Sequence, residues 1–495
     1  MNNIATLPVF FVESNGQSLS QADLLSIEEI VVAQKLSAPA MCEISFSNPA
    51  HQPIEYGASL RLSIGAQKQT VFAGEVTAVE HEYNPGAAKT RIRAYDSLAQ
   101  LRKRFSIKAY VQVKFHDLAT EILRDLEISV AGPGDAPLWQ RFIQYRQSDF
   151  DCLLEVAERA GLFLTLRGDV LQFLTLEGDG SSKTLKLGEQ LLEASLQINR
   201  NDVCDSASVQ GWDPSHVSKN EGVASTPRLA PRIGVPQSIC SRKTLVHEAT
   251  PDASHATALA QAELDYRAAT EVSLAGLVEG DTDLRPGGGI RIEGGTGNFD
   301  GEYVLTEVRH TINRELGYIT EFSTAAPPRR IRRSEFLTVP GTVTRIDDPE
   351  GLGRVCVSLS ACNGLETDWM CVISPGAGKR KGCMTLPDVG DDVLVCCSAE
   401  NPAYGVVLGS LYGAGGMPDA GIESGAVARY TLCTPGGQRV QLDDHRKVIR
   451  LENSAGSYME LTPNHVTVHS ATDFTLDAPG RAIVIQANAI DFRRA

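Results

Sequence analysis

The sequence has few aromatic residues and no long apolar run. Aromatic residues make up 6% of the 495 residues. No run of about 18 apolar residues occurs, so no segment is expected to cross a bilayer as a helix. The first residues, MNNIATLPVFFVESNGQ, contain no basic region followed by an apolar stretch and a cleavage site. A secretory signal peptide is therefore not expected.

Positive charge is also in deficit. The chain has 46 Lys and Arg residues against 61 Asp and Glu residues, which gives a net charge of -15 at pH 7. Such a surface is a poor partner for nucleic acid or for an anionic membrane. Residues 341–413 contain five basic against nine acidic residues, whereas proteins that bind single-stranded nucleic acid use basic grooves with stacked aromatic side chains. Nucleic-acid binding is therefore not expected.

Cysteine pairs of the kind that hold zinc are missing. None of the 11 cysteines forms a C-x-x-C pair, and most lie between apolar residues, as in VLVCCSA and WMCVIS. This pattern predicts small buried thiols in a β core and a reducing compartment, with no metal site. Seven of the cysteines fall within one short region: Cys356, Cys362, Cys371, Cys383, Cys396, Cys397 and Cys433.

Catalytic motifs are missing as well. The sequence contains no GxSxG, HExxH or Walker loop and no Cys/His constellation, so neither catalytic residues nor a cofactor are predicted. The loop IDDPEGLGR places Asp347, Asp348 and Glu350 close together. These carboxylates could hold a cation, but we favour a turn at the end of a hairpin.

Short alternating runs, typical of β-strands, fill most of the chain. Residues 1–95 contain several of them, and three amphipathic segments follow between about 96 and 162: DSLAQLRKRF, HDLATEILRDL and SDFDCLLEVAERAG. A hairpin, a polar stretch from Trp212 to Pro251, a helix at ASHATALAQAELDYRAA and more strands come next. The segment AAPPRRIRRSEF is rich in Pro and Arg and predicts a linker.

Two segments of this first part resemble each other. Residues 57–81 and 287–310 share a glycine, an alternating trio, a turn, Phe-x-Gly-Glu and Val-x-His. A true duplication predicts two related β-barrels, at about 1–95 and 165–325, within a unit of residues 1–335. Chance similarity between short β segments stays open as the alternative.

Six short strands are predicted between residues 336 and 415. They are GTVTRID, GRVCVSLS, DWMCVIS, GCMTLP, DDVLVCCSA and YGVVLGSLY. This strand count and size are typical of a small closed barrel such as an OB-fold.

The last part, residues 416–495, alternates in runs that each offer only two or three apolar side chains. One copy of such a segment is too small to form a core. The apolar faces therefore need a partner outside this segment. The side chains predicted to point inward are Val440, Leu442, Leu451, Met459, Leu461, Val466, Val468, Phe474, Leu476, Ile483 and Ile485.

Several long segments resemble VgrG-type spike proteins, the fused hub and spike of contractile injection systems and phage baseplates. VTRIDDPEGLGRVCVSL and TDWMCVISPGAGKRKGCMTLPDVGDDVLVCCSAENPAYGVVLGSLYG are similar to the OB domain of that family. QYRQSDFDCLLEVAERAGLFLTLRGDVLQF and LRPGGGIRIEGGTGNFDGEYVLTEVRH are similar to its hub half. The resemblance runs in order over nearly the whole chain.

The resemblance implies a mainly β protein with a hub of duplicated barrels and helical inserts, an OB-fold barrel and a C-terminal trimeric β-helix. It implies a structural role as a homotrimer that caps a hexameric inner tube, organises baseplate proteins and is driven through a target membrane when a sheath contracts. Effector cargo is a possible further partner. A conical PAAR-like tip protein is expected to dock on Ile490, Phe492, Arg493 and Arg494.

In such a spike His465 and His469 would lie on outward strand faces, so no metal is predicted there, although threefold symmetry leaves that question open. Assembly is expected in the bacterial cytoplasm, followed by release in an injection particle or entry into the target cell. The compact form resembles spikes of extracellular phage-tail-like particles more than the longer spikes of type VI secretion.

An enzyme acting on cell-wall glycan, from a phage tail or secreted, is the competing function. Some members of the family carry a muramidase between barrel and β-helix, or a toxin beyond the tip. Here 20 residues, GAGGMPDAGIESGAVARYTL, separate the predicted barrel from the predicted β-helix, and the sequence ends at Ala495. Neither addition is therefore expected.

Overall fold

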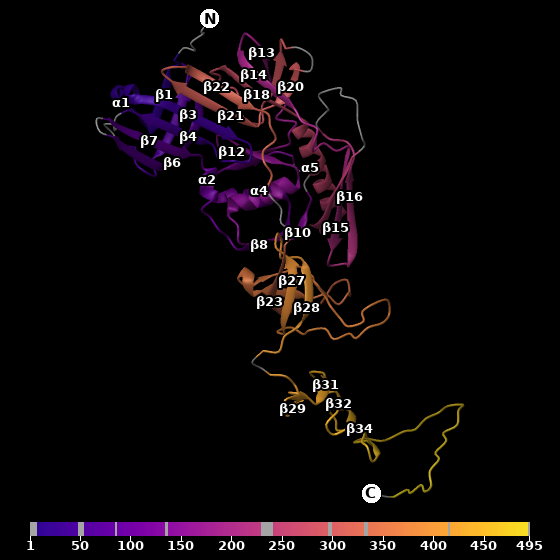
Figure 1. The fold of residues 1–495 in the computed structure, drawn as a ribbon. Helices are drawn as coiled ribbons and strands as arrows, with labels where there is room; N and C mark the ends of the chain where they lie inside the picture. The colour runs from indigo at the N-terminus through magenta and orange to yellow at the C-terminus, as the bar shows by residue number, and fades with distance from the viewer. Residues whose placement is uncertain are drawn as a thin grey trace. The chain divides into compact units, whose positions relative to one another are not determined.

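The structure is a computed structural model that describes residues 7–47, 54–84, 87–133, 137–228, 241–295, 299–330, 335–413 and 416–493. The chain divides into two compact units, Met1–Leu411 and Tyr412–Ala495 (Figure 1). Most described elements are strands, as the sequence predicted, so the mainly β fold class is confirmed. Among the described residues, no helix is long and apolar enough to cross a bilayer.

The first unit is built around an eleven-stranded antiparallel sheet. Indigo strands from the start of the chain and orange strands from residues 272–323 lie side by side in it (Figure 1). A short helix, α1 (Gln21–Ser26), precedes β3 and is capped by Ser20. The strands, in order across the sheet, are β14 (Leu191–Ile198), β18 (Val272–Glu279), β22 (Gly317–Ser323), β21 (Glu307–Asn313), β3 (Ile27–Lys35), β4 (Met41–Phe46), β7 (Ala87–Tyr95), β6 (Gln69–Asn84), β5 (Ser59–Ile64), β1 (Phe10–Ser14) and β2 (Gln17–Ser18).

The strand order of this sheet repeats. The neighbours β14, β18, β22 and β21 are followed by β3, β4, β7 and β6, and the two sets have the same order along the chain. β5 pairs with the first half of β6, and β19 (Gly289–Glu293) pairs in the same way with β20 (Gly301–Val304), which leads into β21. The two segments that resemble each other in sequence lie on these equivalent strands. The sequence repeat predicted two related barrels. In the structure β21 and β3 pair edge to edge, so the two sets of strands lie in one sheet.

Local details recur in both sets of strands. A bulge lies near the start of β3 and another near the start of β14. His81 on β6 lies opposite Thr90 on β7, with its ring Nδ1 3.1 Å from the threonine hydroxyl. His310 on β21 lies opposite Thr320 on β22 with the same contact, also at 3.1 Å. Topology, bulge and side-chain pair thus follow the sequence repeat.

Two insertions interrupt the repeated strands. The second insertion, which follows β14, forms three strands and then the predicted helix: β15 (Ser206–Asp213), β16 (Ser218–Ala224), β17 (Arg242–Ala249) and α5 (Ala253–Glu271). The first insertion contains α2 (Leu98–Leu101), β8 (Lys108–Val113), α3 (Phe115–Leu123), β9 (Ser129–Ala131), β10 (Trp139–Gln144), α4 (Asp149–Arg159), β11 (Phe163–Arg167), β12 (Val170–Leu174) and β13 (Ser182–Lys186).

Two of the amphipathic segments predicted in the first insertion can be compared with the structure. Ser148 caps α4, because its hydroxyl oxygen accepts a hydrogen bond from the Asp151 amide. Phe150 and Leu153 of this helix are buried. The helix expected over DSLAQLRKRF is only four residues long, because the chain becomes extended before Phe105, which stays exposed.

The OB barrel follows the linker. Val355 and Met370 exchange two backbone hydrogen bonds of 2.9 and 2.8 Å, which join the two sides of the sheet and close it. Five of the six expected strands are present, but residues 382–387 form none, and a short strand at Leu365–Glu366 is found instead. The order across the sheet is β25 (Leu365–Glu366), β24 (Cys356–Leu359), β23 (Phe336–Arg345), β27 (Asp392–Ser398), β28 (Gly405–Ser410) and β26 (Cys371–Val372).

The OB barrel and the first insertion share one apolar core. Asn401 is buried between them: its side-chain oxygen accepts from the Ile143 amide at 3.0 Å, and its amide nitrogen donates to the Arg141 carbonyl at 3.1 Å. Arg159 of α4 also pairs with Glu400. The barrel is therefore packed onto the insertion, not only tethered by the linker.

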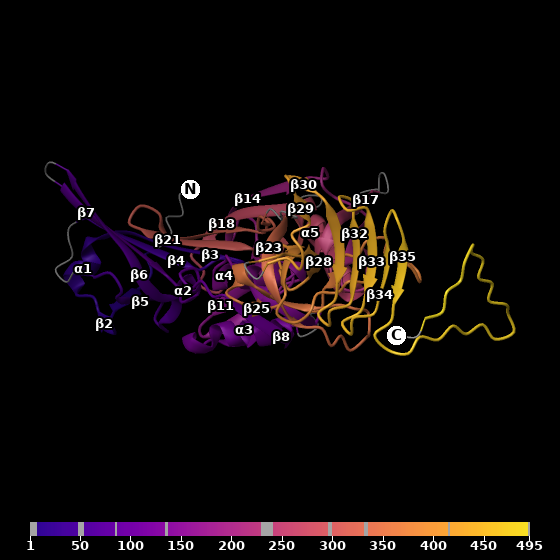
Figure 2. The ribbon, with the colours of Figure 1, turned by 90° about the horizontal axis from the view of Figure 1, so that it is seen from below.

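The second unit is a five-stranded antiparallel meander, preceded by a two-stranded ribbon of β29 (Ile422–Glu423) and β30 (Ala426–Val427). Figure 2 shows its yellow strands side by side in chain order. The expected strands around residues 474–476 and 483–485 are not formed in the described chain. The meander contains β31 (Arg429–Cys433), β32 (Arg439–Asp443), β33 (Val448–Glu452), β34 (Tyr458–Leu461) and β35 (Val466–His469).

The first prediction concerns Asn401. Asn401→Ala should lower the free energy of unfolding by about 2 kcal/mol, because a buried amide and a buried carbonyl lose their partner. Urea unfolding of the full chain measures this difference. Lys379→Ala, at an exposed position of the same barrel, is the matched control. Equal stability of the two variants would show that Asn401 does not join the insertion to the barrel.

Candidate functional site

One face of the C-terminal meander is apolar across all five strands. Strand pairing places Leu432, Val440, Leu451, Met459 and Val468 directly opposite one another in one row. Successive side chains of a strand point to opposite faces, so residues two apart share a face. The second row on this face consists of Tyr430, Leu442, Ile449, Leu461 and Val466.

These rows contain seven of the eleven side chains predicted to point inward, and the structure brings those seven together on one face. In the single chain they remain accessible: Leu461 is half-buried and the other six are exposed. Sequence reasoning missed Tyr430, Leu432 and Ile449. The alternation RYTLC and KVIRLE could have indicated all three.

The remaining predicted inward residues lie beyond the last strand. Phe474, Leu476, Ile483 and Ile485 are exposed and belong to no strand of the described chain. Their packing therefore stays a prediction.

The predicted tip-docking residues are also solvent-accessible. Ile490 and Phe492 are exposed, and Arg493 pairs with Asp491 at 2.6 Å. Arg494 lies outside the described residues.

The opposite face of the meander is polar and internally paired. Arg450 forms ion pairs with Glu452 at 3.0 Å and with Glu460 at 3.1 Å. His469 stacks on Tyr458 with ring centroids 5.0 Å apart. A sheet with one apolar and one paired polar face is built to cover the first and expose the second.

A carboxylate fixes the start of this polar face. Asp419 accepts hydrogen bonds from Arg429, Thr431 and Gln441, on two neighbouring strands. The bonds from Arg429 above all hold the pKa of Asp419 well below its usual range. The loop before the meander is thereby tied to β31 and β32.

In the large sheet of the first unit, the equivalent strands β21 and β6 differ in the number of strands that pair with them. β21 pairs with β22 on one side and with β3 on the other. The matching half of β6, from Val76 onward, pairs only with β7. His310 is accordingly 2% exposed, whereas its counterpart His81 is exposed.

The acidic loop of the OB barrel folds as a turn, not as an open cation loop. The Asp348 carboxylate accepts hydrogen bonds from the backbone amides of Glu350 and Leu352 and from the Arg354 guanidinium. The Arg354 contact lowers the pKa of Asp348. Among the described residues no group of His, Cys, Asp and Glu side chains has the arrangement of a metal site.

The cysteines follow the prediction in part. Burial raises the pKa of the Cys356 and Cys397 thiols to about 12, so both are protonated in the barrel core. Cys383 and Cys433 are exposed, contrary to the expected buried pattern. Both lie in or beside loops, where no second sheet layer covers them.

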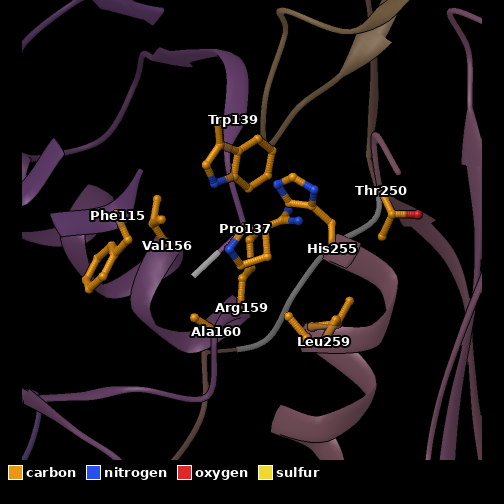
Figure 3. A pocket seen from close by; sticks show the side chains of 10 residues that line it. Phe115, Pro137, Trp139, Val156, Arg159, Ala160, Thr250, His255 and Leu259 are labelled. Atoms are coloured by element: carbon orange, nitrogen blue, oxygen red, sulfur yellow. The ribbon is translucent and has the colours of Figure 1, made fainter. Parts of the chain in front are cut away.

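A small cavity lies where α4, β10 and α5 meet (Figure 3). Its volume is about 20 Å³, which is enough for one water molecule but not for a sugar substrate. The Nδ1–H group of His255 donates to the Asp252 carboxylate at 3.0 Å, and the ring packs edge-on against Trp139. Burial lowers the pKa of His255, so the ring is neutral at pH 7.

A larger groove of about 1000 Å³ separates the β15–β17 sheet from the barrel. Its lining is mostly apolar and includes Trp212, Phe336 and Ile373. Glu221 supplies the one carboxylate of this lining, whereas glycoside hydrolysis ordinarily needs a pair of carboxyl groups. Among the described residues that line the groove, such a pair is therefore not present.

Solved structures with this fold come from secretion systems and phage tails. The Francisella PdpA–VgrG complex aligns over 94% of this chain and 81% of its own, with 8% identity and a TM-score of 0.56. The E. coli c3393 protein, a type VI secretion component, aligns over 80% and 99%, with 15% identity and a TM-score of 0.54. The 43 kDa tail protein of prophage MuSo2 from Shewanella oneidensis aligns over 64% and 97%, with 15% identity and a TM-score of 0.50.

Two family models match the sequence, and no curated protein does. Residues 339–412 match the type VI secretion system and phage-baseplate injector OB domain, which confirms the predicted barrel type. Residues 30–314, more than half of the chain, match the Alg8 N-terminal domain. The chain therefore belongs to the family defined by the Alg8 N-terminal domain, and its fold and OB domain are those of a VgrG-type spike protein.

Proposed function

We propose that this protein is the central spike and hub of a contractile injection system, which caps the inner tube, organises the baseplate and is driven through a target envelope. The apolar face of the C-terminal meander is the observation that carries the proposal. Ten apolar side chains in two rows are left without a second layer in the single chain. An exposed apolar face of this extent marks an interaction site.

Three copies of the chain supply the missing layer. A trimer places three such faces toward one axis, so that the rows bury one another while the paired polar faces stay in solvent. The segments holding Phe474, Leu476, Ile483 and Ile485 extend the same triangular β-helix toward the tip. The last residues then offer an apolar end to a PAAR-like tip protein.

The hub joins its copies through strand edges. β21 and β3 show how one set of four strands meets the next within a chain. The same junction between chains pairs the open half of β6 with β14 of the next copy, because β14 occupies the position of β3 and pairs only with β18. Three chains then contribute six equivalent sets of strands, a number that matches a hexameric tube protein.

The residue pairing across this junction between chains follows from the pairing of β21 with β3 within one chain. Thr311 lies opposite Val31 within the chain. Their counterparts, set by the histidine pair and the two bulges, are Glu82 and Ser195. Glu82 of one chain is therefore opposite Ser195 of the next.

The remaining parts of the proposal follow from this role. The chain assembles in the bacterial cytoplasm, joins baseplate proteins and leaves in an injection particle, with an extracellular phage-tail-like particle favoured. Effector cargo can travel with it. A cell-wall hydrolase is the competing function, but neither the small cavity nor the groove offers two facing carboxylates.

The second prediction tests the spike. Leu451→Asp places three carboxylates near the axis of the proposed trimer and should abolish assembly of the β-helix, because charges would be buried without partners. Light scattering measures the mass of the assembly. Arg439→Asp lies on the polar face of the neighbouring strand and should leave the mass unchanged. A wild-type chain that is monomeric at micromolar concentration would refute the proposal.

The third prediction tests the hub. The pair Glu82→Cys and Ser195→Cys should form disulfides between chains, because directly opposed strand residues have the spacing that a disulfide needs. Non-reducing gels should then show covalent trimers. Glu82→Cys combined with Lys219→Cys, off this edge, is the control pair. Equal cross-linking in both variants would contradict the proposed register.

The fourth prediction concerns enzymatic activity. The purified trimer should give no cleared band on a zymogram containing peptidoglycan, because neither the cavity beside His255 nor the groove beside the barrel offers two facing carboxyl groups. A lysozyme lane establishes sensitivity. A cleared band that persists through purification would favour the hydrolase.

A further inference from the structure

The acidic loop of the OB barrel meets the β15–β16 turn at one histidine. The Nδ1 atom of His216, in that turn, lies 2.5 Å from a carboxylate oxygen of Asp213. Its Nε2 atom lies 3.2 Å from a carboxylate oxygen of Glu350, in the barrel loop. The imidazole is therefore held between two carboxylates, one from each side of the contact.

Carboxylates at both ring nitrogens require two N–H donors, and only a protonated imidazole has two. When the ring is neutral, it can keep one proton. The shorter contact and the lower exposure of Asp213 favour keeping that proton on Nδ1. The unprotonated Nε2 then presents a lone pair to the Glu350 carboxylate, and an attraction across the contact becomes a repulsion.

The guanidinium of Arg354 is the charged group near the ring that opposes its protonation. Arg354 lies 3.5 Å from Nε2, but its guanidinium is also bound to Asp348 at 2.6 Å and to Glu350 at 3.0 Å. The thiol of Cys371 donates to the Ser215 carbonyl beside the ring, at 3.2 Å. The carboxylates of Asp213, Asp348 and Glu350 thus outnumber the one permanent cation, Arg354. A positive charge on His216 reduces this excess of negative charge.

We propose that His216 is a proton-dependent latch that fastens the OB barrel to the β15–β16 turn when its imidazole is protonated and loosens that contact when the ring is neutral. This device goes beyond the proposed spike function and does not depend on trimer formation. The hydrogen bond to Asp213, followed by that to Glu350, raises the pKa of His216 above its ordinary value of 6.5. The contact is therefore complete below pH 6.5 and is lost as the pH rises through the raised pKa.

The titration of His216 tests the contact directly. In the full chain with ¹³C-labelled histidine, the His216 signal is assigned by its loss in His216→Gln and followed by NMR against pH. Glu350→Gln should move the titration midpoint down, because a carboxylate across the contact is removed. Asp347→Asn, in the same loop but bound to Arg345, should leave the midpoint unchanged. An unchanged midpoint in Glu350→Gln would overturn the proposal.

Hydrogen exchange tests the loosening. After correction for the intrinsic pH dependence, amides of residues 348–354 should exchange about two- to fivefold faster above the His216 pKa than below it, the range expected for a partly exposed ion pair. This difference should disappear in His216→Gln and persist in His445→Gln, whose ring pairs with Glu423 in the second unit. Wild-type exchange without a pH-dependent difference would also overturn the proposal. Neither result bears on the trimer, which is measured separately.

Discussion

An open strand edge carries unpaired backbone groups, and covering such edges is the constraint on which this structure depends. Within the chain, β3 covers β21, and the bridge between Val355 and Met370 closes the OB barrel. The second half of β6, the outer side of β14 and the outer side of the last meander strand β35 have no neighbouring strand among the described residues. The proposed hub ring and spike are both solutions to this one requirement.

Secondary structure could be predicted best from the sequence where the apolar residues of a local pattern are also buried. The α4 helix, the OB strands and the likeness of residues 57–81 to 287–310 could all be read from short-range patterns, because the spacing of apolar residues marks the face that each element buries. The C-terminal strands were also predictable from alternation. Ile449 was overlooked although it completes the row between Leu442 and Leu461.

Pairing between distant segments could not be predicted from local patterns. Nothing in β3 or β21 specifies that these strands, which are separated by more than 250 residues, form one junction. The strand at Leu365–Glu366 replaced the one expected at residues 382–387, since barrel closure selects its strands by position and not by propensity. The bridge from His216 to Glu350 likewise spans 134 residues and follows no motif.

The common core of the first insertion and the OB barrel has a mechanical consequence. In the proposed function, a force on the barrel passes into the insertion through these packed side chains, and the hydrogen bonds of Asn401 resist shear at the boundary. In that role the barrel is joined to the insertion by a packed interface, which transmits compression as well as tension.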